Sequence, residues 1–258
     1  MTTSSGKVGT LLREWRQRKG VSQLDLALSA DSSSRHISFI ETGRARPSQE
    51  MLLRLANELD VPVRDRNALL VAAGFAPQFS EKPLRDPTLA PMWDGISKLL
   101  TGYEPYPALV VDGLYNVHAT NAGLDLLLDG VASHLLAPPA NAMRITLHPE
   151  GLAPRILNLA QWRHHLLEQM TRHMALVRSP QLRALYDEVS AYPVNDATPV
   201  RAESPYALPM ALEHHGQVLS FTSSIATFNT PMDVTVSELA IEMFLPADSE
   251  TAAYMRTG

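Results

Sequence analysis

The sequence has no cysteine, few glycines and no long apolar run. Without cysteine, the chain can form no disulfide, no thiolate zinc site and no cysteine nucleophile. No apolar segment approaches the ~18 residues that a membrane span needs. The opening segment MTTSSGKVGTLL lacks the charged and then apolar layout of a secretory signal. We therefore expect a cytoplasmic protein with no membrane partner.

Sequence motifs of the common enzyme classes are also missing. The 13 glycines form neither G-x-G-x-x-G nor a phosphate-binding loop, and there is no G-x-S-x-G or H-E-x-x-H segment. His164 and His165 are neighbours on an expected helix. His214 and His215 are neighbours on an expected strand, where adjacent side chains point to opposite faces. The sequence therefore predicts no catalytic residue and no metal site, and we do not expect an enzyme.

Charge is unevenly distributed along the chain. The net charge of the 258 residues is −5, which by itself argues against nucleic acid as a partner. Residues 1–80, however, contain 11 Lys and Arg against 8 Asp and Glu, a balance of +3, whereas the remaining 178 residues contain 11 against 19, a balance of −8. This distribution is typical of a chain in which only the N-terminal part contacts phosphate.

Residues 21–47 predict two short helices joined by a tight polar turn. Ser22 can cap the first helix, and Asp31-Ser32-Ser33 interrupts the apolar pattern and supplies new capping oxygens. The second helix is expected from about Ser34 to Thr42, and Gly43 takes the position of a left-handed C-cap. The pattern therefore indicates a helix-turn-helix.

The two motif helices each have an apolar face and a polar face. The residues expected to face the core are Leu24, Leu26, Ala27 and Ala30 in the first helix, and Ile37, Ile40 and Phe39 in the second. The exposed N-terminal turn of the second helix has Ser33, Ser34 and Arg35, and Arg44 and Arg46 follow the motif. Short polar and basic groups of this kind suit phosphates and base edges.

Three more helices are expected around the motif, over Val8–Lys19, over a segment that Ser48 caps, and over Arg64–Ala73. Together the five helices predict an all-α domain at residues 1–78. Residues 79–106 are expected to be a proline-rich linker with one short connecting helix, Met92–Leu100.

From residue 107 the pattern changes to strands. The expected strands are Ala108–Val111, Tyr115–His118, Arg144–Leu147, Leu208–His214, Val218–Phe228 and Thr235–Leu245. The expected helices are a short one from Asn121 to Leu128, a long one that opens at Gly151–Pro154 and ends near Val177, and Pro180–Ala191. This order predicts an α+β domain at residues 107–258, with an antiparallel sheet and helices over one face.

The segments SQLDLA, SSSRHISFIETGRARPS and LLRLANELDVP resemble the XRE family of Cro/C1-type helix-turn-helix regulators over residues 8–62. The segments VRDRNALLVAAGFAP, EPYPALVVD and HPEGLAPRI extend this resemblance to the MmyB-like branch, over nearly the entire chain. In that branch the helix-turn-helix is followed by a PAS-like domain that holds a fatty acid. The resemblance therefore implies a DNA-binding domain of Cro/C1 type and a PAS-like ligand-binding domain.

The resemblance also implies roles for individual residues. Gln23 matches the glutamine that opens the first motif helix and contacts a backbone phosphate. Ser34 and Arg35 match the head of the recognition helix, where base edges are read, and Ser38 lies one turn further on. Glu41 matches an acidic residue that is buried against the fold and bonded to backbone or to a basic residue of the first helix.

Two interpretations of Phe39 remain open, because it lies where some relatives have a polar residue that reads a base. Its ring could pack on a thymine methyl group or belong to the core. The predicted DNA-binding residues are Gln23, Ser33, Ser34, Arg35, Ser38, Arg44 and Arg46.

The PAS-like domain is expected to bind its ligand between the sheet and the helices. The candidate wall residues are Val110, Val117, Trp162, Leu166, Met170, Met174, Phe221, Ile225, Phe228 and Met243. Methionine suits a flexible acyl chain because its unbranched thioether adapts in shape. The alternative is that these residues fill an ordinary core. The candidate cations for a fatty-acid carboxylate are His148, Arg155, Arg163, His164, His165 and Arg172.

Two functions are therefore considered. In the first, the chain is a sequence-specific transcriptional regulator that binds operator DNA as a homodimer, and a small apolar ligand in the PAS-like domain tunes this binding. The resemblance makes a medium- to long-chain saturated fatty acid the candidate ligand, and no other cofactor is expected. In the alternative, the chain is a constitutive DNA-binding factor whose C-terminal domain serves only dimerisation or partner docking.

Overall fold

The computed structural model describes residues 4–177, 179–194, 207–228 and 231–257. Their contacts divide the chain into two units. The N-terminal unit consists of Met1–Pro83 with Thr230–Ser237, and the C-terminal unit consists of Leu84–Asn229 with Glu238–Gly258. The expected connecting helix therefore belongs to the C-terminal unit, and a short segment from late in the chain belongs to the N-terminal unit.

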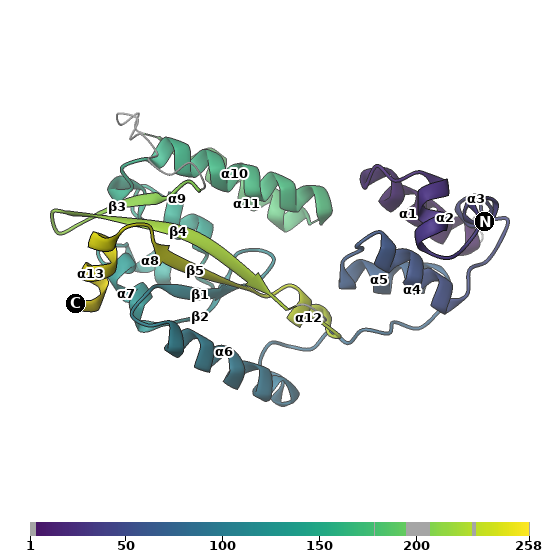
Figure 1. The fold of residues 1–258 in the computed structure, drawn as a ribbon, viewed down its shortest axis with the longest axis horizontal. Helices are drawn as coiled ribbons and strands as arrows, with labels where there is room; N and C mark the ends of the chain where they lie inside the picture. The colour runs from purple at the N-terminus through teal and green to yellow at the C-terminus, as the bar shows by residue number, and fades with distance from the viewer. Residues whose placement is uncertain (1–3, 178, 195–206, 229–230, 258) are drawn as a thin grey trace. The chain divides into compact units, whose positions relative to one another are not determined.

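The helices of residues 4–72 follow the predicted order (Figure 1). They are α1 (Ser4–Arg18), α2 (Gln23–Ser29), α3 (Ser34–Glu41), α4 (Gln49–Glu58) and α5 (Val63–Ala72). The side chains of Ser22, Ser33 and Ser48 each accept a hydrogen bond from a backbone N–H of the helix that follows. Such caps satisfy donors that the first helical turn leaves free, so the predicted helix starts are fixed locally.

The core of this helical region is apolar and close-packed. It includes Val8, Leu12 and Trp15 of α1, and Ile37 and Ile40 of α3. Helix α1 approaches α3 at Gly9, where a Cβ atom would lie 2.4 Å from the carbonyl oxygen of Ile40. Only glycine fits at this position without a shift of the backbone.

Two residues that were expected in this core lie elsewhere. Leu24 is 57% exposed, because α2 turns Leu26 and Ala27 inward instead. Phe39 is half-buried and lies outside the core cluster, with its ring centroid 5.2 Å from the guanidinium carbon of Arg35. The expectation that Phe39 faces the core is therefore wrong, since α3 presents its buried face through Ile37 and Ile40.

A short helix, α12 (Val234–Ser237), completes the N-terminal unit. Val234 is 1% exposed and packs with Val63 and Phe79. The hydroxyl of Ser80 donates to a carboxylate oxygen of Asp233 at 2.6 Å, and the backbone N–H of Val234 donates to the carbonyl of Ser80 at 2.7 Å. The predicted strand from Thr235 was wrong at its start, because these contacts hold residues 234–237 in a helical turn.

The C-terminal unit is built on an antiparallel sheet with the strand order β2-β1-β5-β4-β3. The strands are β1 (Ala108–Val111), β2 (Val117–Thr120), β3 (Met210–His214), β4 (Gln217–Thr227) and β5 (Ala240–Pro246). The first hairpin turns at Tyr115 and the second at His215 and Gly216, and all three residues have a positive φ. A five-stranded sheet with helices inserted between β2 and β3 confirms the predicted α+β plan.

The expectation of helices over one face was wrong, because helices lie on both faces of this sheet (Figure 1). The larger core lies on the side of α10 (Leu159–Leu176) and α11 (Pro180–Ser190), and it includes residues of three short helices, α7 (Ala122–Leu128), α8 (Ser133–Leu136) and α9 (Ala142–Leu147). Helix α6 (Ala90–Tyr103) covers the opposite face through Ile96 and Leu100, which pack against Val110 and Ile241. Strand β1 is consequently buried on both faces.

Some C-terminal elements differ from the sequence prediction. Residues 144–147 belong to α9 and not to a strand, because the Asn141 side chain accepts from the backbone N–H of Arg144 and starts a helix. The expected start of the long helix is a separate 3-10 turn, η2 (Ala153–Arg155), and α10 begins only after Asn158. The side-chain amide of Asn158 donates to the carbonyl of Pro209 and accepts from the backbone N–H of Ala211 in β3. Another 3-10 turn, η1 (Pro87–Leu89), and α13 (Ser249–Thr257) complete the elements.

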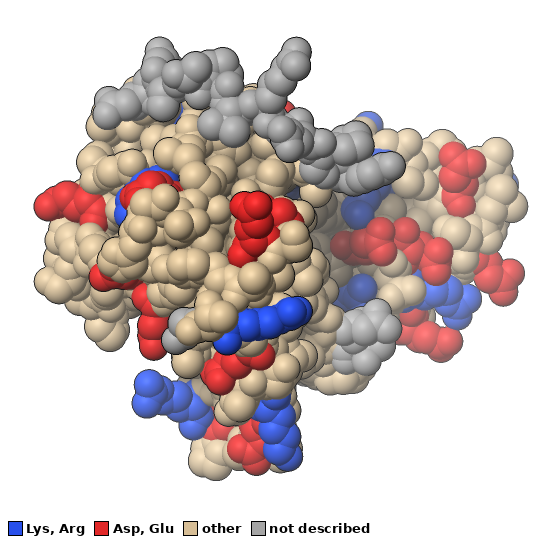
Figure 2. Space-filling model, turned by 60° about the vertical axis from the view of Figure 1, so that its left-hand side comes forward, with Lys and Arg blue, Asp and Glu red and all other residues tan. Residues whose placement is uncertain are grey.

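The surface has mixed charge on the face that Figure 2 shows. Acidic and basic side chains stand there in small groups between wide uncharged areas, so that face has no broad field of one sign. Among the described residues, no helix is both long and apolar enough to cross a bilayer.

Candidate functional site

The first turn of α3 presents a polar surface. Ser33, Ser34 and Arg35 are exposed, and Ser38 is half-buried one turn further on. Ser33 already caps α3 by accepting from the backbone N–H of His36 at 3.1 Å. Ser34 and Arg35 are therefore the side chains of this turn that are best placed to contact an external partner.

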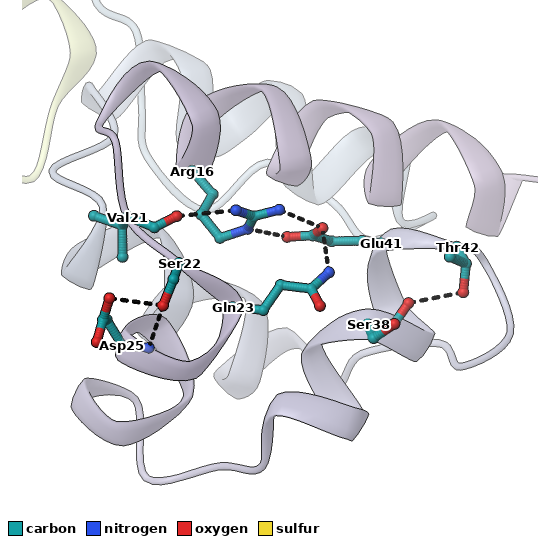
Figure 3. A network of polar contacts seen from close by, with 8 residues as sticks. All are labelled: Arg16, Val21, Ser22, Gln23, Asp25, Ser38, Glu41 and Thr42. Atoms are coloured by element: carbon teal, nitrogen blue, oxygen red, sulfur yellow. Dashed lines mark hydrogen bonds and ion pairs between the residues drawn. The ribbon is translucent and has the colours of Figure 1, made fainter.

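A partly buried ion pair joins α1 to the last residue of α3 (Figure 3). The guanidinium of Arg16 donates through Nε to Oε1 of Glu41 at 2.6 Å and through Nη2 to Oε2 at 2.9 Å. Its Nη1 donates to the carbonyl of Val21 at 2.9 Å. The hydrogen bond to Glu41 raises the pKa of Arg16. Two parallel bonds of this kind fix orientation as well as distance, so the pair sets how α3 sits on α1.

Gln23 belongs to the same network (Figure 3). Its Nε2 donates to Oε2 of Glu41 at 2.9 Å. Glu41 thus accepts from a basic residue of the first helix, as expected, and also from the glutamine that opens α2. Gln23 is half-buried, and the bond to Glu41 orients its amide before any partner is bound.

The two arginines after the motif differ in their surroundings. Arg44 is exposed. Arg46 donates through Nη2 to the carbonyl of Ala73 at 2.7 Å, and its guanidinium carbon lies 5.8 Å from the ring centroid of Phe75. Arg46 therefore closes the end of α5, although it is exposed as Arg44 is.

The C-terminal unit contains a cavity of about 360 Å³. Its polar wall residues are His118, Thr120, Thr146 and Glu242. The other wall residues are Leu109, Val117, Ala119, Leu124, Leu127, Leu128, Leu136, Pro138, Ala140, Ala142, Met143, Ile145, Leu152, Trp162, Leu166, Met210 and Phe244. This size and apolar character are those of a site for a small molecule.

The sequence prediction of the cavity wall was only partly successful. Val117, Trp162 and Leu166 line the cavity. Val110, Phe228 and Met243 lie on the opposite side of the sheet, in the cluster with α6. Of the remaining candidates, Met170, Met174 and Phe221 pack in or against the core, and Ile225 is exposed.

The strand register explains these differences. Leu109 pairs with Glu242, and both line the cavity, whereas Val110 pairs with Ile241 on the face that α6 covers. The sequence shows the alternation of β5 but not which of its faces borders a cavity. A lone acid inside the apolar strand at residues 240–246 was the available signal for Glu242.

None of the described wall residues of the cavity is Lys or Arg. The side chains that were expected to bind a carboxylate lie outside the wall. Each has another partner. Arg155 donates to the carbonyl of Leu127, and Arg163 donates to the carbonyl of Ser190. His164 and Arg172 lie near Glu168, the ring of His165 stacks on Trp162, and His148 accepts from the backbone N–H of Glu150.

Two groups of side chains have ligating atoms within 4.8 Å of one another, namely Asp129, His214 and His215, and His134, His148 and Glu150. The expectation that His214 and His215 point to opposite faces was wrong, because His215 lies in the hairpin turn with a φ of 48° and the two rings are 4.2 Å apart. Burial, then the charges of His215 and Arg155, lower the pKa of His214. Arg155 opposes a cation at this position, and we assign no metal there.

Comparisons with known proteins agree with this geometry. Residues 93–257 match the family of the MmyB-like transcription regulator ligand binding domain, and residues 12–65 match a helix-turn-helix family. A search of curated proteins found no match.

Two solved structures are similar to part of the chain. The clp gene regulator ClgR from C. glutamicum is 30% identical, with 29% of this chain and 92% of that chain covered and a TM-score of 0.26. The restriction-modification controller protein C.AhdI from Aeromonas hydrophila is 34% identical, with 24% and 92% covered and a TM-score of 0.23. TM-scores this low carry no structural argument.

A helix-turn-helix with an exposed polar recognition helix, joined to a unit with an apolar cavity, defines a DNA-binding transcription regulator with a ligand-binding domain. The match to the ligand-binding family spans more than half of the residues, and the chain belongs to the MmyB-like transcription regulators. The two matched families are families of non-enzymatic regulators.

Proposed function

We propose that the chain is a sequence-specific transcriptional regulator whose affinity for operator DNA is tuned by a small apolar ligand. The candidate ligand is a medium- to long-chain saturated fatty acid or a close relative of it. The observation that carries this proposal is the apolar cavity of about 360 Å³ inside the domain that matches a ligand-binding family. We expect the protein to act in the cytoplasm, as a homodimer.

In the proposed complex, α3 enters the major groove and its first turn contacts base edges. Arg35 is exposed at that turn, and the ring of Phe39 lies beside its guanidinium, which favours a fixed side-chain direction over a freely rotating one. Ser34 and Ser38 follow the same face. Gln23 contacts a phosphate, with its amide already oriented by Glu41. Arg44 supplies an exposed positive charge next to the motif.

The homodimer follows from the way that such motifs read DNA. One recognition helix covers only a few base pairs, and two copies on half-sites roughly 34 Å apart combine their contacts. Sedimentation of the purified protein with a selected duplex checks this part: two chains per duplex are expected, and one chain per duplex contradicts it.

Coupling between ligand and DNA is proposed to run through α12. The chain leaves the C-terminal unit after β4, contributes α12 to the N-terminal unit, and returns as β5. Glu242 and Phe244 of β5 line the cavity. A ligand that shifts β5 therefore acts on a strand that continues directly from a segment held by Ser80 and Val63. Such a switch requires the ligand to favour one arrangement of α12 over another.

The test is extraction of the purified protein followed by mass spectrometry of the extract. Recovery of one apolar molecule per chain supports the proposal, and so does a changed affinity for a selected duplex after its removal. The opposite result is protein without a bound molecule, whose DNA affinity and melting temperature do not change when dodecanoic acid or 1-dodecanol is added. That result supports the alternative, a constitutive DNA-binding factor whose C-terminal unit serves only dimerisation or partner docking.

A further inference from the structure

Among the described wall residues of the cavity, Glu242 alone has a carboxyl group, and it stands in an otherwise apolar strand. Glu242 lies in β5, pairs with Leu109 of β1, and faces the cavity together with Phe244. Its neighbours Ile241 and Met243 face the other side of the sheet. Alternation along the strand therefore fixes the Glu242 side chain toward the cavity and not toward the face that α6 covers.

The surroundings of this carboxyl group favour its neutral form. Burial raises the pKa of Glu242, and this outweighs the hydrogen bond that the Ser223 hydroxyl donates to Oε1 at 2.7 Å. Among the described wall residues, His118 is the other group that titrates near neutral pH. His118 of the wall is engaged with Asp112 at 2.9 Å. Burial, and next the charge of Glu242, raises the pKa of Tyr115 to about 12.

Among the described residues, the wall also has a buried hydrogen-bond donor without a partner. Trp162 is 2% exposed and lines the cavity, and its indole N–H has no hydrogen-bond partner among the described residues. A buried donor that stays unsatisfied destabilises the protein. A ligand oxygen that accepts a hydrogen bond would satisfy such a donor, and a protonated Oε2 of Glu242 would offer another.

A ligand carboxylate, in contrast, would be destabilised in this cavity. No described wall residue is Lys or Arg, so a second negative charge in the cavity has no strong counter-charge. Two carboxylates in one apolar site cannot both stay ionised, because each raises the pKa of the other. An uncharged head group of the same size avoids this repulsion.

We propose that Glu242 binds the head group of the ligand and makes the cavity select an uncharged oxygen head group over a carboxylate. The ligand class is an apolar chain that ends in an ester, an alcohol or a protonated acid. This inference rests on the proposed function, since it assumes that the cavity is the ligand site. A fatty acid would then enter in its protonated form.

The test compares three probes with the same chain, methyl dodecanoate, 1-dodecanol and dodecanoic acid, by calorimetric titration of the full-length protein after lipid removal. At about pH 8 the ester and the alcohol should bind wild type at least roughly tenfold more tightly than dodecanoate. In Glu242→Gln, which keeps size and hydrogen bonding, this preference should shrink at least roughly threefold, because the repulsion is removed while the wall still lacks a counter-charge. Glu250→Gln, an exposed glutamate on α13, is the matched control and should behave like wild type.

The ester provides a second readout, because it has no titratable group. Its affinity for wild type should fall as the pH rises through the raised pKa of Glu242, where the carboxyl group loses the proton that it donates. In Glu242→Gln the same affinity should stay constant, which separates Glu242 from His118. Two results refute the inference: wild type binds dodecanoate more tightly than the alcohol at about pH 8, or the pH dependence of ester binding is unchanged in Glu242→Gln. In either case the cavity would still be the ligand site. Binding of none of the probes overturns the cavity as the site.

Discussion

The proposed coupling through α12 predicts that Val234→Ala separates ligand binding from DNA regulation. Val234 is 1% exposed and packs with Val63 and Phe79, so the substitution removes two methyl groups from a buried contact. At about 0.8 kcal/mol per buried carbon, plus the cost of the space that is left, the loss is roughly 1.5 to 3 kcal/mol. The hydrogen bonds of Ser80 to Asp233 and Val234 remain, so we expect a weakened and not an abolished contact.

A loss of this size lowers the population of the docked α12 at least roughly tenfold relative to its undocked form. The ratio of DNA affinities with and without saturating 1-dodecanol should consequently move toward one in the variant. Val234 does not line the cavity, so 1-dodecanol should still bind the variant, with an affinity that changes by no more than the shift in the α12 equilibrium. Fluorescence anisotropy with a labelled duplex, selected by the wild-type protein from a randomised pool, measures the DNA affinity under both conditions.

Val218→Ala is the matched control. It removes the same two methyl groups from β4, but Val218 is 52% exposed. The control should regulate as wild type does. If Val234→Ala keeps the full ligand-dependent change in DNA affinity, α12 does not carry the coupling and this part of the account is refuted.

Three more predictions concern single residues. Arg35→Ala should change base preference at one position of each half-site by about 1–3 kcal/mol, whereas Gln23→Ala should weaken binding evenly across sequences, as measured by selection from a randomised pool; wild-type preference and affinity in both variants would contradict the docking. Glu41→Ala should destabilise the N-terminal unit by about 3–5 kcal/mol in urea unfolding, because it leaves Arg16 without its buried partner; a loss below about 1 kcal/mol would count against the ion pair. Glu242→Gln should gain stability over wild type as the pH rises, because a raised pKa in the folded state stabilises it at low pH and this contribution is lost above that pKa; parallel pH profiles of the unfolding free energy would refute the assignment.

The helix-turn-helix could be predicted from the sequence because local chemistry determines it. Ser22, Ser33 and Ser48 cap the helices that follow them, and these caps need no distant partner. Phe39 was misplaced, since its helical position borders both the buried stripe and the exposed face. There the contact with Arg35, and not the periodicity, decides where the ring lies.

The cavity could be predicted only in outline, because its wall depends on tertiary contacts. Periodicity identifies β1 and β5, but α6 buries their second face, so Val110 and Met243 are as apolar as Leu109 and Phe244 on the cavity side. A pattern of alternating residues cannot separate two buried faces. Residues 142–147 are similarly ambiguous, since a short apolar run fits a strand or a helix until the Asn141 cap is seen.

The proposed function is tested most directly by the DNA affinity of the lipid-free protein during titration with the C12 probes. Anisotropy of the selected duplex should change with probe concentration, and the half-maximal change should coincide with the dissociation constant that calorimetry gives for the same probe. The change should be larger for 1-dodecanol than for dodecanoic acid at about pH 8. A DNA affinity that stays constant while calorimetry records probe binding would contradict ligand control of DNA binding.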